Sequence, residues 1–235
     1  MPHRWCDSAK IRYDQIESGL DLTFNDVFKP FYKEKITALH PSKIMEVGAG
    51  TGHLSKEIFS LGYKITALEP SKGMYDVAKH VLKDTDVTLL NCTSGDLKEH
   101  ESFDLAFSHL VAHAVDDLPV FIGSIFANIR SGGYFIFSIP HPCFYNNYKN
   151  FLGAEYNYMT PMKKIVSFKI TKDLENAISN VPYNHRPIST YINTLVSTGF
   201  VLADLNEIYP NQKTQEKYGA VWEEPRYCVF TCRKS

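Results

Sequence analysis

The sequence is poor in three features that would assign it to familiar classes: paired cysteines, excess basic charge and long apolar runs. Its five cysteines are scattered without C-x-x-C spacing, which excludes the usual patterns of a disulfide framework or a zinc site. Lysine and arginine number 25 against 26 aspartates and glutamates, and no basic run is present. This balance disfavours a nucleic acid partner. We expect free thiols in a reducing compartment and no bound metal ion.

No stretch approaches the ~18 uncharged apolar residues that a membrane span requires. Residues 1–7 lack the apolar core of a signal peptide. These absences predict a cytoplasmic protein without a membrane partner. What is present is a hydrophobic content of 44% over 235 residues, which suits a single domain covering residues 1–235.

The most informative stretch is residues 43–52, Lys-Ile-Met-Glu-Val-Gly-Ala-Gly-Thr-Gly. An apolar run that breaks into three alternating glycines predicts a buried strand, a tight turn and the start of a helix. Glycine lets a backbone approach a ligand closely, and a helix N-terminus offers unpaired N–H groups. The dinucleotide fingerprint G-x-G-x-x-G would need glycine at position 53, where this chain has His53.

The G-x-G-x-G spacing, with Glu46 two positions before the first glycine, resembles motif I of the class I S-adenosylmethionine-dependent methyltransferases. The resemblance covers residues 43–139 well and the closing strands more loosely. It implies S-adenosyl-L-methionine as cofactor and S-adenosyl-L-homocysteine as product. It also implies that Glu46 supplies negative charge to the ammonium and sulfonium of the cofactor, directly or through water. From the glycines alone, the turn could instead be a tight connection without a ligand.

Two further acidic residues follow at positions that suit a nucleoside. Glu69 ends the predicted strand 63–68 and lies 21 positions after the first glycine, where such folds place a carboxylate for the ribose hydroxyls. The resemblance gives Asp96 the adenine amino group and packs Leu97 on the adenine ring. Each of the two acids could instead be a solvated or turn-forming residue.

Other positions complete the expected cofactor site. The resemblance brings Tyr13 to the methionine end of the cofactor, although Tyr13 could equally pack on the sheet edge. Met74 is the member of its helical stripe nearest the strand end and could touch adenine, and Ser108 ends the fourth strand at the pocket wall. The full expected set is Tyr13, Glu46, Gly48, Ala49, Gly50, Gly52, Glu69, Pro70, Ser71, Met74, Gly95, Asp96, Leu97 and Ser108.

Alternating strands and helices predict the fold. The strands are almost continuously apolar, which indicates a parallel sheet covered on both faces. We expect an α/β, doubly wound, seven-stranded and mostly parallel sheet of the Rossmann-like methyltransferase type, with an antiparallel last strand, N-terminal helices and an insertion after strand five. The single domain then has four parts: a helical cover over 1–42, a cofactor-binding core over 43–139, a substrate cap over 140–186, and a last helix with closing strands over 187–235.

The insertion 140–186 carries many aromatic residues and is, at 47 residues, far longer than an ordinary connection. It leaves from the carboxyl end of a parallel strand, the edge where ligands bind in open α/β sheets. We therefore expect its aromatic side chains to roof a substrate pocket. The alternative is that they form a core of their own or a contact within a homodimer.

Methyl transfer from a sulfonium is an in-line displacement, in which the protein mainly positions the acceptor in a dry pocket. An acceptor that carries a proton also needs a base, and imidazole suits that task. Candidates at the predicted rim are His109, His113, His141 and His185. We favour His141 and His185, which flank the insertion, and keep His113 as a third catalytic candidate, while any of them could instead be a packing histidine.

The sequence thus predicts methyl transfer from S-adenosylmethionine to an oxygen, nitrogen or carbon atom of a small-molecule substrate. Pro140-His141-Pro142 and His185-Arg186-Pro187 look like the small-molecule branch of the family. Two alternatives stay open. One is a non-catalytic module that keeps the cofactor fold and uses the aromatic insertion for a protein partner. The other is a nicotinamide-dependent oxidoreductase, against which His53 argues.

Overall fold

The structure is a computed structural model that describes residues 5–6, 8–97 and 100–235. Residues 1–4 and 7 are not included. The prediction that residues 1–7 lack the apolar core of a signal peptide therefore lies largely outside the described residues. Within that part, no helix has the length and apolar character needed to cross a membrane.

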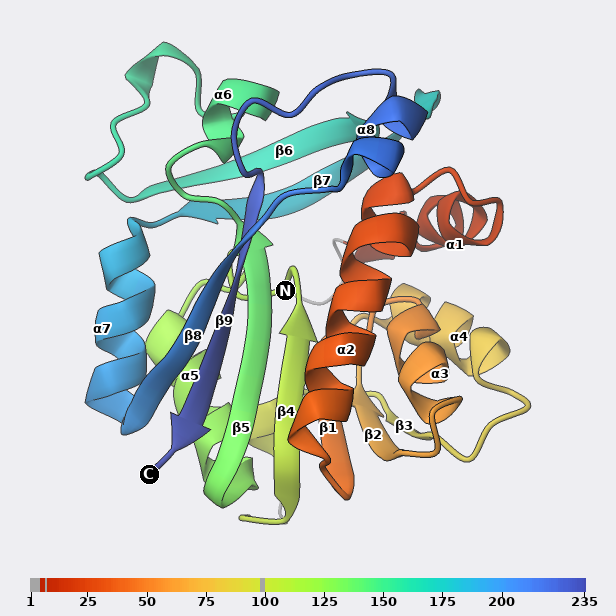
Figure 1. The fold of residues 1–235 in the computed structure, drawn as a ribbon, viewed down its shortest axis with the longest axis vertical. Helices are drawn as coiled ribbons and strands as arrows, with labels where there is room; N and C mark the ends of the chain where they lie inside the picture. The colour runs from red at the N-terminus through yellow and green to blue at the C-terminus, as the bar shows by residue number, and fades with distance from the viewer. Residues whose placement is uncertain (1–4, 7, 98–99) are drawn as a thin grey trace.

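Seven strands of the described chain form one sheet in the order β3-β2-β1-β4-β5-β9-β8 (Figure 1). All pairs up to β5 are parallel, whereas β9 is antiparallel to both of its neighbours, β5 and β8. This confirms the predicted doubly wound α/β fold with an antiparallel last strand. The strands are β1 Lys43–Val47, β2 Lys64–Leu68, β3 Thr88–Leu90, β4 Phe103–His109, β5 Ile129–Pro140, β8 Phe200–Ile208 and β9 Tyr227–Lys234.

Helices cover both faces of the sheet, as the apolar strands require. Because side chains alternate along a strand, Ile44 of β1 joins the hydrophobic cluster beneath α2 and α3, while Met45 joins the cluster beneath α5 and α7. Both side chains are fully buried. The helices of the sheet are α2 Lys29–Leu39, α3 His53–Phe59, α4 Lys72–Val81, α5 Leu118–Asn128 and α7 Ile188–Thr198.

The boundary between α5 and β5 shows local chemistry and tertiary pairing acting together. The Asp117 carboxylate caps α5 by accepting the Val120 N–H at 2.9 Å, a favourable way to satisfy an orphan donor. The helix ends at Asn128, and Ile129 already pairs with Phe103 of β4. Long-range strand pairing therefore sets this helix end.

The N-terminal segment is helical, as predicted. It consists of α1 Ala9–Glu17, a π-helix Thr23–Phe28 and α2. The side chain of Phe28 is fully buried and that of Phe24 is nearly so. Both therefore anchor the segment to the sheet.

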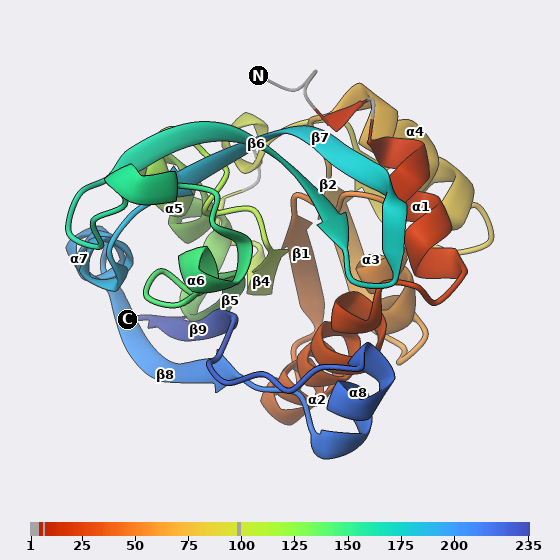
Figure 2. The ribbon, with the colours of Figure 1, turned by 90° about the horizontal axis from the view of Figure 1, so that it is seen from above.

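The insertion after β5 folds as a hairpin with a short helix. Its elements are α6 Tyr145–Lys149, β6 Met162–Ile170 and β7 Asp173–His185, and the two strands pair antiparallel. A further helix, α8 Gln212–Tyr218, lies between β8 and β9. Figures 1 and 2 show the hairpin, α6 and α8 lying across the carboxyl edge of the sheet, with the far end of the hairpin beside α1.

Aromatic side chains of the insertion pack mainly on one another and on β9. Tyr145 stacks on Tyr183 with ring centroids 6.1 Å apart and tilts against Tyr227 of β9 at 5.4 Å. Tyr145 and Tyr183 are both buried. These contacts favour the alternative in which the aromatic residues of the insertion form a core of their own, with the difference that Tyr227 of β9 also belongs to it.

Candidate functional site

A cavity of about 420 Å³ lies at the carboxyl ends of β1, β2 and β4. It is lined by the glycine turn after β1, by the end of β2, by the N-terminal cover, and by six residues at and after the end of β4: His109, Leu110, Val111, Ala114, Val115 and Asp116. Of the insertion, Pro182 alone among the described residues contributes to its wall. The cavity therefore lies at the edge where open α/β sheets bind ligands.

The glycine turn leaves room for a ligand at one position and packs tightly at another. Gly48 and Gly50 both have positive φ, at +75° and +56°. A Cβ on Gly48 would lie 2.5 Å from Cγ2 of Val111, so this glycine permits close packing against the segment after β4. A Cβ on Gly50 would meet no atom within 4 Å. The backbone at Gly50, which lines the cavity, is thus open to a bound molecule.

Glu69 is held at the cavity by two backbone donors. Its Oε2 accepts the Gly50 N–H at 2.7 Å, and its Oε1 accepts the Ser71 N–H at 2.7 Å. Burial raises the pKa of this carboxyl to about 7, and the two backbone hydrogen bonds oppose that shift. The side chain is therefore oriented before any ligand arrives.

Glu46 is the second carboxyl of the cavity. Its side chain is 1% exposed and accepts a short hydrogen bond from the Ser55 hydroxyl. Burial raises the pKa of Glu46 to about 8, and the charge of Glu69 adds to that rise. Two acids whose charged forms are disfavoured thus face one cavity, an arrangement that suits a cationic ligand.

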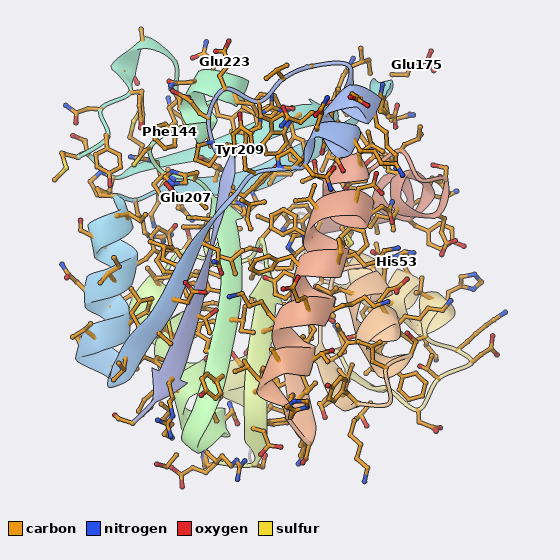
Figure 3. The ribbon with its side chains drawn as sticks, viewed as in Figure 1. His53, Phe144, Glu175, Glu207, Tyr209 and Glu223 are labelled. Atoms are coloured by element: carbon orange, nitrogen blue, oxygen red, sulfur yellow. The ribbon has the colours of Figure 1, made fainter. Side chains whose placement is uncertain are left out.

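His53 joins the glycine turn to the N-terminal cover. Its Nδ1 lies 2.8 Å from the Thr51 hydroxyl and its Nε2 lies 3.0 Å from Oε1 of Glu17 in α1. Burial lowers the pKa of His53, and the hydrogen bond to Glu17 opposes that effect. Figure 3 labels His53 at the end of α3. Sequence reasoning uses this residue only to exclude a dinucleotide motif and misses its place in the cavity wall.

Arg12 of α1 is another wall residue that sequence reasoning misses. Its guanidinium donates to Oδ2 of Asp21 at 2.5 Å and to Oε1 of Gln15 at 2.9 Å. Trp5 and Phe24, also from the cover, line the cavity beside it. No local motif could have identified these residues, because their contact with the cavity arises from folding the cover onto the sheet.

His109 ends β4 and lines the cavity. Its Nδ1 lies 2.9 Å from Oγ of Ser138, which also accepts the Tyr32 hydroxyl at 3.0 Å and the Leu110 N–H at 3.1 Å. The Tyr32 hydroxyl also lies 3.1 Å from the Ser108 carbonyl, so Ser138 and Tyr32 hold the imidazole in a hydrogen-bonded network at the end of β4. Burial lowers the pKa of His109 to about 3. The ring is therefore neutral at ordinary pH.

Eight of the fourteen expected cofactor residues line the cavity, and six do not. Those at the wall are Glu46, Gly48, Ala49, Gly50, Glu69, Pro70, Ser71 and Met74. Those that are not among its lining residues are Tyr13, Gly52, Gly95, Asp96, Leu97 and Ser108.

Local contacts explain why the segment around Asp96 stays away from the cavity. Asp96 is exposed, and its Oδ2 accepts the N–H and the hydroxyl of Thr93 at 2.8 and 2.6 Å. The carboxylate thereby closes the 3₁₀ turn Ser94–Asp96 instead of reaching the cavity, and Gly95 and Leu97 stay outside with it. Thr93 takes the place at the wall.

The remaining three expected residues that do not line the cavity are Ser108, Tyr13 and Gly52. The buried Ser108 hydroxyl donates to the carbonyl of Val47 at 2.8 Å. The ring of Tyr13 lies behind the wall, 5.8 Å from that of the wall residue His53 and 5.9 Å from that of His80 in α4. Gly52 is the N-cap residue of α3, and a Cβ there would lie 3.1 Å from that of Ala78.

None of the three candidate catalytic histidines, His113, His141 and His185, is among the residues that line this cavity. His141 uses both ring nitrogens: Nδ1 accepts the Cys143 N–H at 3.2 Å, and Nε2 therefore donates to Oε1 of Glu207 at 3.0 Å. Glu207 lies toward the left of the view in Figure 3 and His53 toward the right. His141 thus ties the insertion to β8 and has no nitrogen left to take a proton.

His185 and His113 also make their observed contacts outside the cavity lining. Nε2 of His185 donates to the carbonyl of Tyr158 at 2.9 Å, within the cap. Burial lowers the pKa of His113 to about 3, and its ring tilts against Tyr183 at 5.6 Å. The rim histidine that reaches the cavity is His109, which is one of the four candidates at the rim but not one of the three favoured as catalytic.

Comparison with known proteins agrees with this geometry. Residues 45–137 match the family model described as a methyltransferase domain. The matched segment runs from β1 into β5, the part of the chain that builds the wall of the cavity at the glycine turn. S-adenosylmethionine is the cofactor of that family, and the matched residues include the glycine turn, Glu46, Glu69 and His109.

Curated relatives match the methyltransferase domain over part of their length. The malonyl-[acyl-carrier protein] O-methyltransferase of Serratia marcescens is 31% identical over 104 residues, which are 42% of this chain and 39% of that protein. The ubiquinone biosynthesis O-methyltransferase of Paramagnetospirillum magneticum is 28% identical over 95 residues, 40% of this chain and 38% of the relative. The chain thus spans about two fifths of the length of these relatives.

Solved structures share the fold over nearly the whole chain. An S-adenosylmethionine-dependent methyltransferase from Mesorhizobium loti aligns with a TM-score of 0.63 at 23% identity, covering 85% of this chain and 96% of that one. The 1,6-didemethyltoxoflavin-N1-methyltransferase of Burkholderia thailandensis, solved with 1,6-didemethyltoxoflavin and S-adenosylhomocysteine bound, aligns with a TM-score of 0.64 at 16% identity, covering 100% and 91%.

Proposed function

We propose that this protein transfers a methyl group from S-adenosylmethionine to an oxygen, nitrogen or carbon atom of a small-molecule acceptor. The observation that carries the proposal is the cavity wall in which the open backbone of Gly50 meets the preoriented carboxylate of Glu69. A net charge of −1 and the absence of a basic run in the sequence support a small acceptor rather than a nucleic acid.

The chain's own residues would hold the cofactor as follows. Glu69 accepts hydrogen bonds from the two ribose hydroxyls, since its oxygens are already aimed by Gly50 and Ser71. Glu46 provides negative charge near the cationic methionine end. Met74, which is buried and lines the cavity, gives an apolar contact for adenine.

S-adenosylmethionine supplies an electrophilic methyl group when bound, and the protein's task is to orient the acceptor and exclude water. A cavity of about 420 Å³ is at the small end of ligand sites, so the cofactor takes up much of it. The acceptor approaches beside the neutral ring of His109, which lines the cavity. With its pKa near 3, His109 positions the acceptor and does not take its proton at neutral pH.

Two measurements test the proposal. Saturating S-adenosylhomocysteine should raise the melting temperature, because a ligand at 100 times its Kd adds about 2.7 kcal/mol to stability, whereas NADH should not. Incubation with methyl-labelled S-adenosylmethionine and a cell extract should then yield a labelled small molecule by mass spectrometry. An absent shift with S-adenosylhomocysteine contradicts cofactor binding. A shift without any labelled product would favour the non-catalytic module.

A further inference from the structure

Arg226 lies directly before β9, at the same edge of the sheet as the cavity. Its backbone carbonyl accepts the His141 N–H at 2.9 Å, which attaches this segment to the end of β5. The guanidinium carbon lies 3.6 Å from the ring centroid of Tyr148 in α6 and 4.2 Å from that of Trp222. Two aromatic faces from different segments therefore hold the guanidinium in one orientation.

The guanidinium has no anionic partner in the described part of the chain. None of its N–H groups makes a hydrogen bond or ion pair with a described residue. Of the two acids that precede it in the chain, Glu224 accepts from the side-chain amide of Asn147 at 3.1 Å, and Glu223 is exposed and makes no ion pair with Arg226. Arg226 is partly buried. A guanidinium that is oriented and unpaired can donate two parallel hydrogen bonds to a planar oxyanion.

Trp222 supplies a second unpaired donor at the same place. Its side chain is 1% exposed, and its Nε1 has no hydrogen-bond partner among the described residues. Buried N–H groups without an acceptor are rare and call for an explanation. Two donors without acceptors, in ring contact with each other, point to one missing acceptor group.

A continuous aromatic wall connects this place to the cavity. The ring of Trp222 lies 6.1 Å from that of Tyr227, Tyr227 lies 5.1 Å from Phe28, and Phe28 lies 4.4 Å from His109. Phe28 is fully buried and Trp222 and Tyr227 are nearly so, so these rings are a packed connection between the position of Arg226 and His109 at the cavity wall. Figure 2 shows the segment between α8 and β9, which carries Trp222 and Arg226, crossing the carboxyl edge between α6 and α2.

We propose that Arg226 and the indole N–H of Trp222 bind a carboxylate of the methyl acceptor, away from the reacting atom. This inference rests on the proposed function and adds the substrate class, a carboxylic acid. A carboxylate is favoured over a phosphate because a guanidinium stacked on rings presents its planar edge, and a planar group matches that edge with two parallel hydrogen bonds.

The test uses tryptophan fluorescence. The chain has two tryptophans, and Trp5 lines the cofactor cavity, so the Trp5→Phe protein reports on Trp222 alone. Benzoate added to this protein, with and without saturating S-adenosylhomocysteine, should change the fluorescence saturably, whereas benzamide should not. In the same background Arg226→Gln should raise the apparent Kd for benzoate at least tenfold. Arg233→Gln should leave that Kd unchanged, because Arg233 contacts the Gly132 carbonyl at the opposite edge of the sheet.

Equal binding of benzoate and benzamide, no saturable change, or an unaltered Kd in Arg226→Gln would each overturn the inference. Phenyl phosphate binding more tightly than benzoate would also overturn it, in favour of a phosphate. S-adenosylhomocysteine affinity, measured separately by calorimetry in each variant, distinguishes the two failures. If it is absent, the proposed function fails. If it is intact while benzoate does not bind, only this inference fails.

Discussion

The carboxylate of Glu69, at the end of β2, accepts the backbone N–H of Gly50 in the turn after β1 at 2.7 Å. Two motifs that are separate in the sequence are thus one unit in the structure. The contact both orients the acid and restrains the glycine turn. A change in either residue should therefore alter the affinity for the cofactor.

Replacing Glu69 with Gln should weaken S-adenosylhomocysteine binding by about 10- to 100-fold. The amide NH₂ would face the N–H of Gly50 or Ser71, and the ribose would lose a charged acceptor, each such hydrogen bond being worth about 1.5–3 kcal/mol. Isothermal titration calorimetry measures the effect. The matched control is Glu57→Gln, because Glu57 pairs with Lys33 outside the cavity. Equal affinities in the two variants would contradict the assigned role.

Alanine at Gly50 should separate ligand binding from backbone strain. Gly50 and Gly62 both have positive φ, at +56° and +92°, and a Cβ added at either position would have no atom within 4 Å. Both substitutions should therefore cost about 1–2 kcal/mol of stability in urea unfolding. Only Gly50→Ala places a methyl group at the cavity, so only this variant should lose S-adenosylhomocysteine affinity, by at least tenfold. A similar loss in Gly62→Ala would argue against a cofactor at the turn.

The buried acids predict how stability varies with pH. The pKa values of Glu46 and Glu69 rise from 4.5 to about 8 and about 7 on folding, so the folded state holds protons that the unfolded state has released. Their contribution to stability should therefore be complete in acid, below the unfolded-state pKa, and should be lost as pH rises through the two folded-state values, by up to about 1.4 kcal/mol per pH unit for each acid. Urea unfolding at several pH values measures this slope. Glu46→Gln should flatten it, whereas Glu175→Gln, at an exposed position shown in Figure 3, should not.

Cofactor binding should release protons for the same reason. S-adenosylmethionine carries a sulfonium that its demethylated product lacks, and a positive charge near Glu46 favours the ionised carboxyl. At neutral pH the number of protons released should be greater for S-adenosylmethionine than for S-adenosylhomocysteine. Calorimetry in buffers of different ionisation enthalpy gives this number. Identical values for the two ligands would place the sulfonium away from Glu46.

His141→Ala should reduce stability without affecting the cofactor. The substitution removes the hydrogen bond to Glu207 and the acceptor for the Cys143 N–H, which together stabilise the fold by about 1–3 kcal/mol. S-adenosylhomocysteine affinity should stay within about twofold of the wild type, because His141 does not line the cavity. Urea unfolding and calorimetry test the two expectations. If the variant loses S-adenosylhomocysteine affinity while its stability is unchanged, His141 contributes to the binding site.

Sequence reasoning succeeds where function depends on residues close together in the chain. The glycine spacing and Glu46 belong to one strand and turn, and Glu69 follows at a distance set by one helix and one strand. It fails for the histidines, because a position at the rim does not reveal what the ring will bind. The partner of His141, Glu207, is 66 residues away, and Asp96 is held by its neighbour Thr93.

The sequence by itself determined the doubly wound sheet, the glycine turn and the acids that end β1 and β2, because hydrophobic periodicity and glycine conformation act locally. Only the tertiary structure decided that His109 faces the cavity, that Arg12 and His53 join its wall, and that Arg226 has no counterion among the described residues. Those outcomes depend on contacts between side chains from distant segments. Such contacts form only when the segments are buried together in the folded protein, so proximity along the chain does not reveal them.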